Sequence, residues 1–231
     1  MVIALLMAVL VVVLGRSRER ARTVVCGANI RQLTFALSMY ANDCETFPHA
    51  LDDTLSSTPE GGFPGNPMYD RVGWWWFNHI ADYSKRNKDR PSSIFCPSRK
   101  IKSGMLKNNV LCGNYGANLS VCKASSSLPG RDDFSGQPLR IEDISRAGET
   151  LVVVDSGYSM ITWLHVADSP PVPLGNAAED TAYIPGLKMN EDRNLSTDQK
   201  LDAVQGRHPN KTVNVGFADG HVSRTEAEDL S

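Results

Sequence analysis

The sequence predicts an α+β protein in which a long N-terminal helix packs on an antiparallel β-sheet head with long loops. Three observations predict this fold. The first 45 residues contain no proline and keep a helical spacing of apolar residues. Residues 150–154 are mostly apolar and residues 211–217 alternate apolar with other residues, and both patterns are typical of strands. The second stretch leads into Asp-Gly, a strong hairpin signal. The predicted division is a stem helix over 1–45 and a head over 46–231.

The N-terminal run "MVIALLMAVLVVVLG" is apolar on every side of a helix rather than on one face. Its residues before Gly15 would extend about 21 Å as a helix, which is short of the roughly 30 Å of a bilayer core. We expect part of a longer membrane or filament helix, with a buried core helix as the alternative. The residues expected to make filament contacts are Ile3, Leu5, Leu6, Val9, Leu10 and Leu14.

The helical spacing continues beyond this run, through "RSRERARTVVCGANIRQLTFALSMYAND". Apolar residues recur every three to five positions, which predicts an amphipathic second half of the same helix. Pro48 disfavours helix at the residue before it, so the helix should end shortly before that position. Leu33, Leu37 and Tyr40 are expected to dock the head on this half of the helix.

The net charge of −2 gives no general reason to expect nucleic acid as a partner. Basic residues do gather at the end of the apolar run, at Arg16, Arg18, Arg20 and Arg22. They share this stretch with Glu19. We therefore interpret it as a solvated or lipid-headgroup face rather than a phosphate-binding site.

Five cysteines favour an oxidising compartment with one or two disulfides. None forms C-x-x-C, and no histidine lies at a zinc-finger offset from them. Cys112 and Cys122 bracket a short loop and are the first candidate pair. Cys26 and Cys44 cannot pair if one helix carries both, because eighteen residues of helix separate them by roughly 27 Å.

The head contains an aromatic run, Trp74–Phe77, in a predicted short helix within "RVGWWWFNHIADYSK". Consecutive tryptophans on a helix point in different directions and cannot form one stacking surface. Core or inter-subunit packing is therefore favoured over ligand stacking.

Several further strands are expected in the head. "SSIFCPS" (92–98) predicts a short strand, and "MLKNNVLCGNYGANLS" predicts a strand and then a turn. Residues 150–154 predict a buried strand, with "SMITWLHVADS" as its antiparallel partner. The polar, proline-rich stretch 170–201 predicts a long surface excursion. "KTVNVGF" alternates as a half-buried strand does, and Asp219 and Gly220 predict a two-residue hairpin turn that leads into a return strand at His221.

Four residues could gather into a ligand cluster: Asp155, His208, Asp219 and His221. Their spacing matches no zinc or metalloprotease motif, and the chain has neither a G-x-S-x-G motif nor a phosphate-cradling glycine loop. The sequence therefore predicts a protein that is not an enzyme. The alternative is a membrane-anchored envelope domain that binds a ligand or metal, or hydrolyses a substrate, through Trp74–Phe77 and this cluster.

Several separated motifs occur in a recognisable order: "SRERARTVVCGANIRQLTFALSMYANDCETFP", "SSIFCPS", "NYGAN", "ISRAGETLVVVDS" and "GRHPNKTVNVGFADGHV". In this the chain resembles bacterial type IV pilin-like proteins and type II secretion pseudopilins, in particular the large group with a prepilin-type N-terminal helix and a C-terminal "FADGHV". The resemblance implies a pilin-like fold and a structural subunit of a pilus or pseudopilus-like filament. Its main partner would be further copies of itself in a helical homopolymer.

The resemblance also implies an inner-membrane assembly platform and a prepilin peptidase as partners. It places the protein in the inner membrane before assembly and afterwards in a periplasmic or cell-surface filament. Because the family's major pseudopilins are known for a calcium loop near the C-terminus, it implies a structural calcium ion, with Asp155 and Asp219 as candidate ligands. Position 5 is Leu5, and no acidic residue precedes Glu19; by the match over residues 16–26, Met1 would correspond to a position about ten residues inside the family's mature helix.

Overall fold

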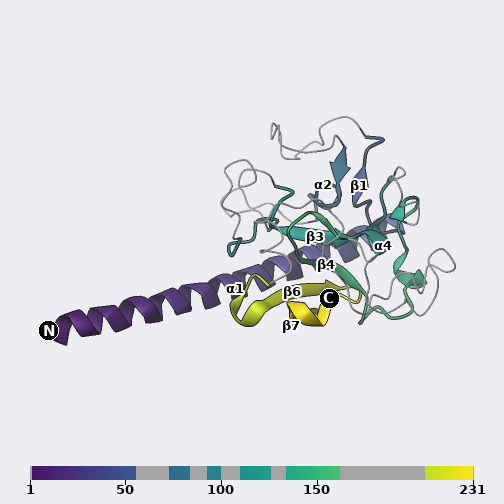
Figure 1. Cartoon of the computed structure of the whole chain (residues 1–231). Coiled ribbons are helices and arrows are strands. Elements are labelled where there is room, and N and C mark those ends of the chain that lie inside the picture. The colour runs from purple at the N-terminus through teal and green to yellow at the C-terminus, as the bar shows by residue number, and fades with distance from the viewer. Residues whose placement is uncertain are drawn as a thin grey trace.

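One helix determines the shape of the molecule. The computed structural model describes residues 2–55, 73–83, 93–99, 110–125, 134–161 and 206–230. Helix α1 (Val2–Cys44) is continuous over 43 residues, and its N-terminal half extends away from the head (Figure 1). The predicted single helix of about forty residues is confirmed.

The head is built on a mixed five-stranded sheet of strand order β5-β3-β4-β6-β7. A second, two-stranded sheet pairs β1 with β2. The strands are β1 (Leu51–Asp52), β2 (Trp74–Trp75), β3 (Tyr115–Asn118), β4 (Leu151–Asp155), β5 (Met160–Ile161), β6 (Thr212–Phe217) and β7 (Val222–Glu226). The short helices are α2 (Trp76–His79), α4 (Leu119–Cys122) and the 3₁₀ turns η2 (Ile141–Asp143), η3 (Pro209–Lys211) and η4 (Ala227–Leu230). The α+β class is therefore confirmed.

One predicted strand pairing and one predicted strand are wrong. Strand β5 pairs in parallel with β3, not antiparallel with β4, because β6 occupies the other edge of β4. Residues 93–99 form turns instead of a strand. The Cys96 N–H donates to the Asn114 side-chain oxygen (3.1 Å) rather than to the carbonyl of a neighbouring strand. The predicted surface excursion over 170–201 lies outside the described residues.

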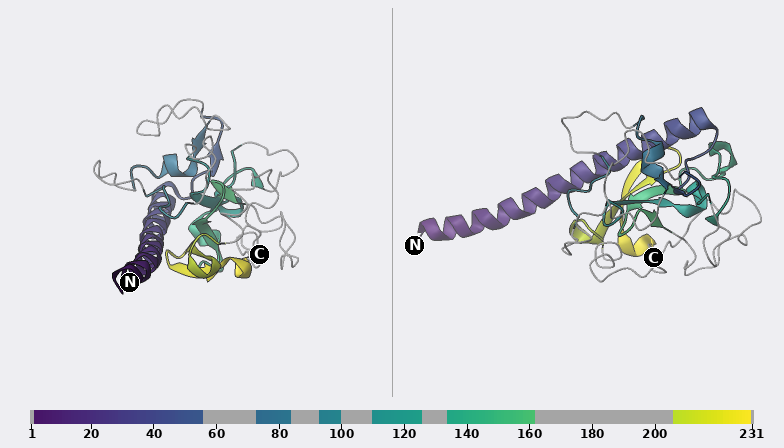
Figure 2. Two further views of the ribbon diagram at one scale, coloured as in Figure 1. Left: turned by 60° about the vertical axis from the view of Figure 1, so that its left-hand side comes forward. Right: turned by 90° about the horizontal axis from the view of Figure 1, so that it is seen from above.

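The second half of α1 lies along one side of the five-stranded sheet (Figure 2). Its sheet-facing residues recur every three or four positions, as a helix face requires. Leu33 and Leu37 are fully buried in the core, and Tyr40 is half-buried against it. These buried apolar residues hold the head on the helix.

Strand β6 is buried on both faces, so the prediction of a half-buried strand is wrong. Its polar face was expected to meet water but instead meets α1. A Cβ on Gly216 would collide with the Thr34 side chain, and a Cβ on Gly27 would lie 3.4 Å from Asn214 Oδ1. The opposite face carries Val213 and Val215, which are also fully buried. Small and polar residues on β6 therefore mark the line of closest helix approach.

The β6–β7 hairpin turns through three residues rather than the predicted two. The N–H of Gly220 donates to the Phe217 carbonyl (2.9 Å), and the N–H of Phe217 donates to the His221 carbonyl (3.0 Å). Gly220 has φ +92°, whereas Asp219 keeps a negative φ. The usual three-residue hairpin loop is a type I turn followed by a residue with positive φ. In this loop only Gly220 takes a positive φ, the conformation that glycine adopts most readily.

The aromatic run enters the core of the head. Trp75, Trp76 and Phe77 are all buried, and Trp76 Nε1 donates to the Ser159 carbonyl (2.9 Å). Beside them, the ring of His79 lies 5.4 Å from Trp74 and 6.0 Å from Tyr40, between centroids. Burial lowers the pKa of His79 to about 4, so its neutral form is stabilised.

We expect Gly216→Ala to destabilise the protein by about 1–3 kcal/mol, because an added methyl must push α1 away from β6. The measurement is urea unfolding followed by circular dichroism. Gly15→Ala is the matched control, since nothing lies within 4 Å of the added atom. Equal stability of the two variants would contradict the close packing of helix on strand.

We expect stability to fall between pH 6.5 and about pH 4 through His79. In this window the unfolded chain takes up a proton at His79 and the folded chain does not, so the free energy of unfolding decreases as the pH falls. The contribution is at most about 3 kcal/mol. It is measured as the difference in pH dependence of urea unfolding between the wild type and His79→Gln. Parallel pH curves for the two proteins would contradict the buried, neutral state.

Candidate functional site

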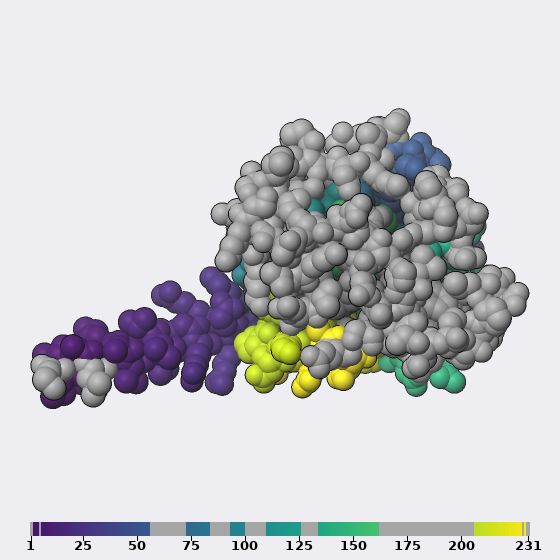
Figure 3. All heavy atoms as spheres, viewed as in Figure 1, coloured from purple at the N-terminus to yellow at the C-terminus, as the bar shows by residue number. Residues whose placement is uncertain are grey.

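Residues 2–14 of α1, the projecting segment, carry exposed apolar side chains all round the helix. Exposure is 75% for Ile3, 64% for Leu6, 58% for Val9, 51% for Leu10 and 47% for Leu14. Leu5 lies in the helix, but its side chain is outside the described part. Figure 3 shows this segment standing clear of the head. Within the described residues, no helix contains a stretch both long and apolar enough to span a bilayer.

The projecting segment ends at a sharp boundary. All four arginines between residues 16 and 22 are exposed, and Arg22 forms an ion pair with Glu19 (2.7 Å). Thr23 is the first buried residue of α1, and its hydroxyl donates to the Glu19 carbonyl (2.9 Å). Residues 16–22, the charged collar, therefore separate the exposed apolar segment of the helix from the part that is buried against the head.

Just beyond this boundary lies a buried polar cluster centred on Asp155, the last residue of β4. The backbone N–H of Asn214 donates to Asp155 Oδ2 (2.7 Å), and the Asn214 amide donates to the same oxygen (3.1 Å). His208 Nε2 lies 3.0 Å from Oδ2, and Cys26 Sγ donates to Oδ1 (2.9 Å). A carboxylate with this many donors is held in one position.

Arg207 supplies the buried positive charge. Its guanidinium lies 3.6 Å from Asp155 Oδ1 and donates to the carbonyls of Asn114 and Ser156 (2.7 Å each). Burial alone would raise the pKa of Asp155. The His208 hydrogen bond and the Arg207 charge outweigh it and hold that pKa below its usual value. The cluster thus keeps an ionised carboxylate inside the core.

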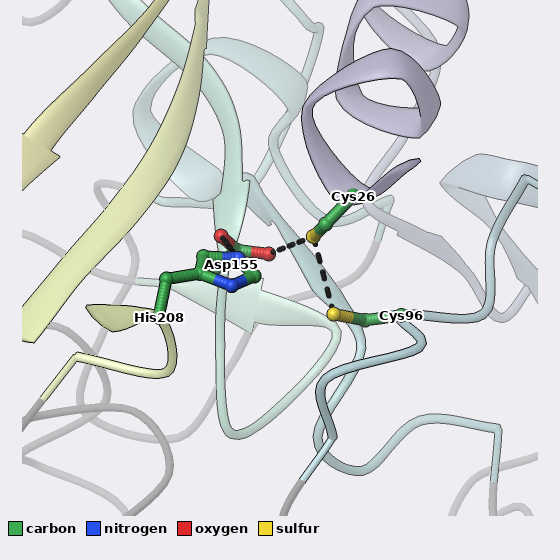
Figure 4. Close-up of side chains that lie close together, drawn as sticks. All are labelled: Cys26, Cys96, Asp155 and His208. Atoms are coloured by element: carbon green, nitrogen blue, oxygen red, sulfur yellow. Dashed lines mark hydrogen bonds and ion pairs between the residues drawn. The ribbon is translucent and has the colours of Figure 1, made fainter. Parts of the chain in front are cut away.

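Two thiols complete the cluster. Cys26 on α1 and Cys96 lie with their sulfurs 3.1 Å apart (Figure 4). The ligand atoms of Cys26, Cys96, Asp155 and His208 all lie within 4.8 Å of one another. Thiolate, imidazole and carboxylate together are a donor set that suits Zn²⁺. These four are the residues that could hold a metal.

The structure separates the four residues of the predicted Asp/His cluster into two pairs. Asp155 and His208 are together in the core, whereas Asp219 and His221 form an exposed pair in the hairpin loop (Oδ1–Nδ1, 2.6 Å). The Asp219 N–H bonds the Ala147 carbonyl, before the start of β4, so the length of β4, about 13 Å, separates the two pairs. Asp155 and Asp219 therefore cannot ligate one calcium ion together, and a structural calcium ion stays a prediction.

Cys112 and Cys122 do not form the expected disulfide in the structure. Cys112 lies before β3 and pairs through its backbone with Tyr158, whereas Cys122 lies beyond the other end of β3, fully buried in α4. The two cysteines are thus held by different neighbours at opposite ends of β3. Cys26 and Cys44 lie on the same helix, α1, as the exclusion of that pair required.

Sequence reasoning missed Cys26, Cys96, Asn214 and Arg207 as members of the cluster. Cys26, Cys96 and the stretch that carries Arg207 and Asn214 are far apart in the sequence, so no local spacing links the two thiols to the other members. One signal was present: Asp155 follows four consecutive apolar residues, where a buried charge needs partners from neighbouring elements.

No protein-family model, no curated protein and no solved structure matches the chain.

We expect Asp155→Asn to cost about 3 kcal/mol or more, because it leaves the buried Arg207 charge uncompensated. Asp219→Asn is the matched control; its pair is exposed and should cost about 1 kcal/mol or less. Urea unfolding at pH 7 measures both. If the two variants lost equal stability, the buried network would not be the stronger constraint.

Proposed function

We propose that this protein is a pilin-like structural subunit of a pilus or pseudopilus-like filament, in which projecting segments from many copies bundle into the core. The observation that carries the proposal is the exposure of large apolar side chains all round residues 2–14. A soluble surface rarely leaves a contiguous apolar patch of this size uncovered. The motif order in the sequence supports the same conclusion.

The distribution of these side chains favours copies of the same segment as the covering partner. A groove on another protein covers one face of a helix, but Ile3, Val9 and Val11 are exposed on different sides. Outside the membrane, a bundle of such segments surrounds each helix with apolar neighbours. Full burial of each Val, Leu or Ile contributes about 1.5–3 kcal/mol before the entropy of assembly is subtracted.

The rest of the chain suits the outer layer of such a filament. The charged collar at residues 16–22 separates the apolar segment from the head. In the amphipathic half of α1, the face that carries Leu33 and Leu37 is already buried against the head. Before assembly the apolar segment would sit in the inner membrane, where an assembly platform and a prepilin peptidase would be the partners. The filament itself would be periplasmic or on the cell surface.

We expect the full chain, moved from detergent into detergent-free buffer, to form filaments above a critical concentration. Leu10→Glu should raise that concentration by about 100-fold or more, because a carboxylate would be buried among apolar helices. Sedimentation measures the assembled fraction, and electron microscopy shows its form. Since Leu10 is exposed in the single chain, circular dichroism of the variant should match the wild type.

Gln32→Glu is the matched control, because it adds the same charge to an exposed position of α1 alongside the head. It should assemble as the wild type does. Equal assembly of Leu10→Glu and the wild type would overturn the bundle. So would a wild type that stays monomeric and only inserts into lipid vesicles.

A further inference from the structure

We propose that Cys26 and Cys96 form a disulfide that ties α1 to the head at the point where the helix leaves it. Their sulfurs are 3.1 Å apart, and a disulfide bond is about 2.05 Å long. About 1 Å of movement therefore closes the gap. This inference rests on the local geometry and does not depend on filament assembly.

The backbone already holds the two cysteines against each other. Cys26 lies on the first buried turn of α1, three residues after Thr23. The segment that carries Cys96 is bonded to the helix on one side, where Asn29 Nδ2 donates to the Phe95 carbonyl (3.1 Å). On the other side, the N–H of Cys96 donates to Asn114 Oδ1 (3.1 Å). Preorganised sulfurs form a bond with little further loss of entropy.

The oxidant is a small or protein disulfide, R–S–S–R, that meets Cys96 while the chain folds, before both sulfurs are buried. The Cys96 thiolate attacks one sulfur of R–S–S–R, forming Cys96–S–S–R and releasing RS⁻. The Cys26 sulfur then attacks Cys96 Sγ, forming Cys26–S–S–Cys96, and the departing RS⁻ takes up the Cys26 proton. In sum, two thiols are oxidised, one R–S–S–R is reduced, and two R–SH leave.

The remaining cluster is compatible with this bond. Asp155 loses only the Cys26 donor, while Oδ2 keeps the Asn214 N–H, the Asn214 amide and His208. A metal ion would instead have to break the Asp155–His208 contact and lie close to the Arg207 charge. The geometry therefore favours the disulfide over the zinc site that the same residues could form.

Peptide mapping of the full chain tests the proposal. The protein is reduced and unfolded, refolded with oxidised glutathione, unfolded again with N-ethylmaleimide, and digested without reductant. We expect one cross-linked peptide pair that joins Cys26 to Cys96, with alkylated Cys44, Cys112 and Cys122. Alkylation of both Cys26 and Cys96, or a bond between other cysteines, would overturn the proposal. Stoichiometric zinc in the purified protein, with both thiols released by a chelator, would also overturn it.

Thermal unfolding provides a second readout. The bond joins residues 70 apart in the chain, so reduction should lower the Tm of the wild type by about 10 °C. Cys96→Ser should not respond to reductant. Cys44→Ser, at an exposed position on the same helix, should respond as the wild type does. An unchanged wild-type Tm on reduction would count against the bond, whatever the filament assay shows.

Discussion

Helix α1 approaches strand β6 so closely that any side chain at Gly216 of β6 would collide with Thr34 of α1. This contact sets the position of the other elements. It buries the polar face of β6, and it places Cys26 against the end of β4. It also leaves the N-terminal half of the helix without a surface to cover it. The exposed apolar segment is thus a consequence of how far the sheet extends along the helix.

The buried charges lie where α1 meets the C-terminal end of β4. Asp155, Arg207 and His208 are all enclosed, and an enclosed charge is tolerated only when its partners are fixed. The partners come from α1, β6 and the residues just before β3 and β6, so the cluster depends on the correct placement of helix and strands. A charged network of this kind favours one arrangement of helix and sheet over alternatives with similar apolar burial.

The sequence was informative where the pattern is local. An unbroken helical spacing predicted α1 to within a few residues, and Leu33 and Leu37 followed from the same spacing. The hairpin was located correctly from Asp219 and Gly220, but its length was not, because the turn type depends on which residue takes a positive φ. The edge strand β5 was misplaced, because its pairing depends on which strand edge is left free.

By itself, the sequence determined the long helix, its apolar and amphipathic halves, and the strands that alternate or are continuously apolar. These follow from side-chain periodicity along a single segment. Only the tertiary structure decided that Cys26, Cys96, Asp155 and His208 meet, and that Asp219 does not join them. The physical reason is that strand order and helix placement bring together residues up to about 180 positions apart, and no spacing within one segment records that.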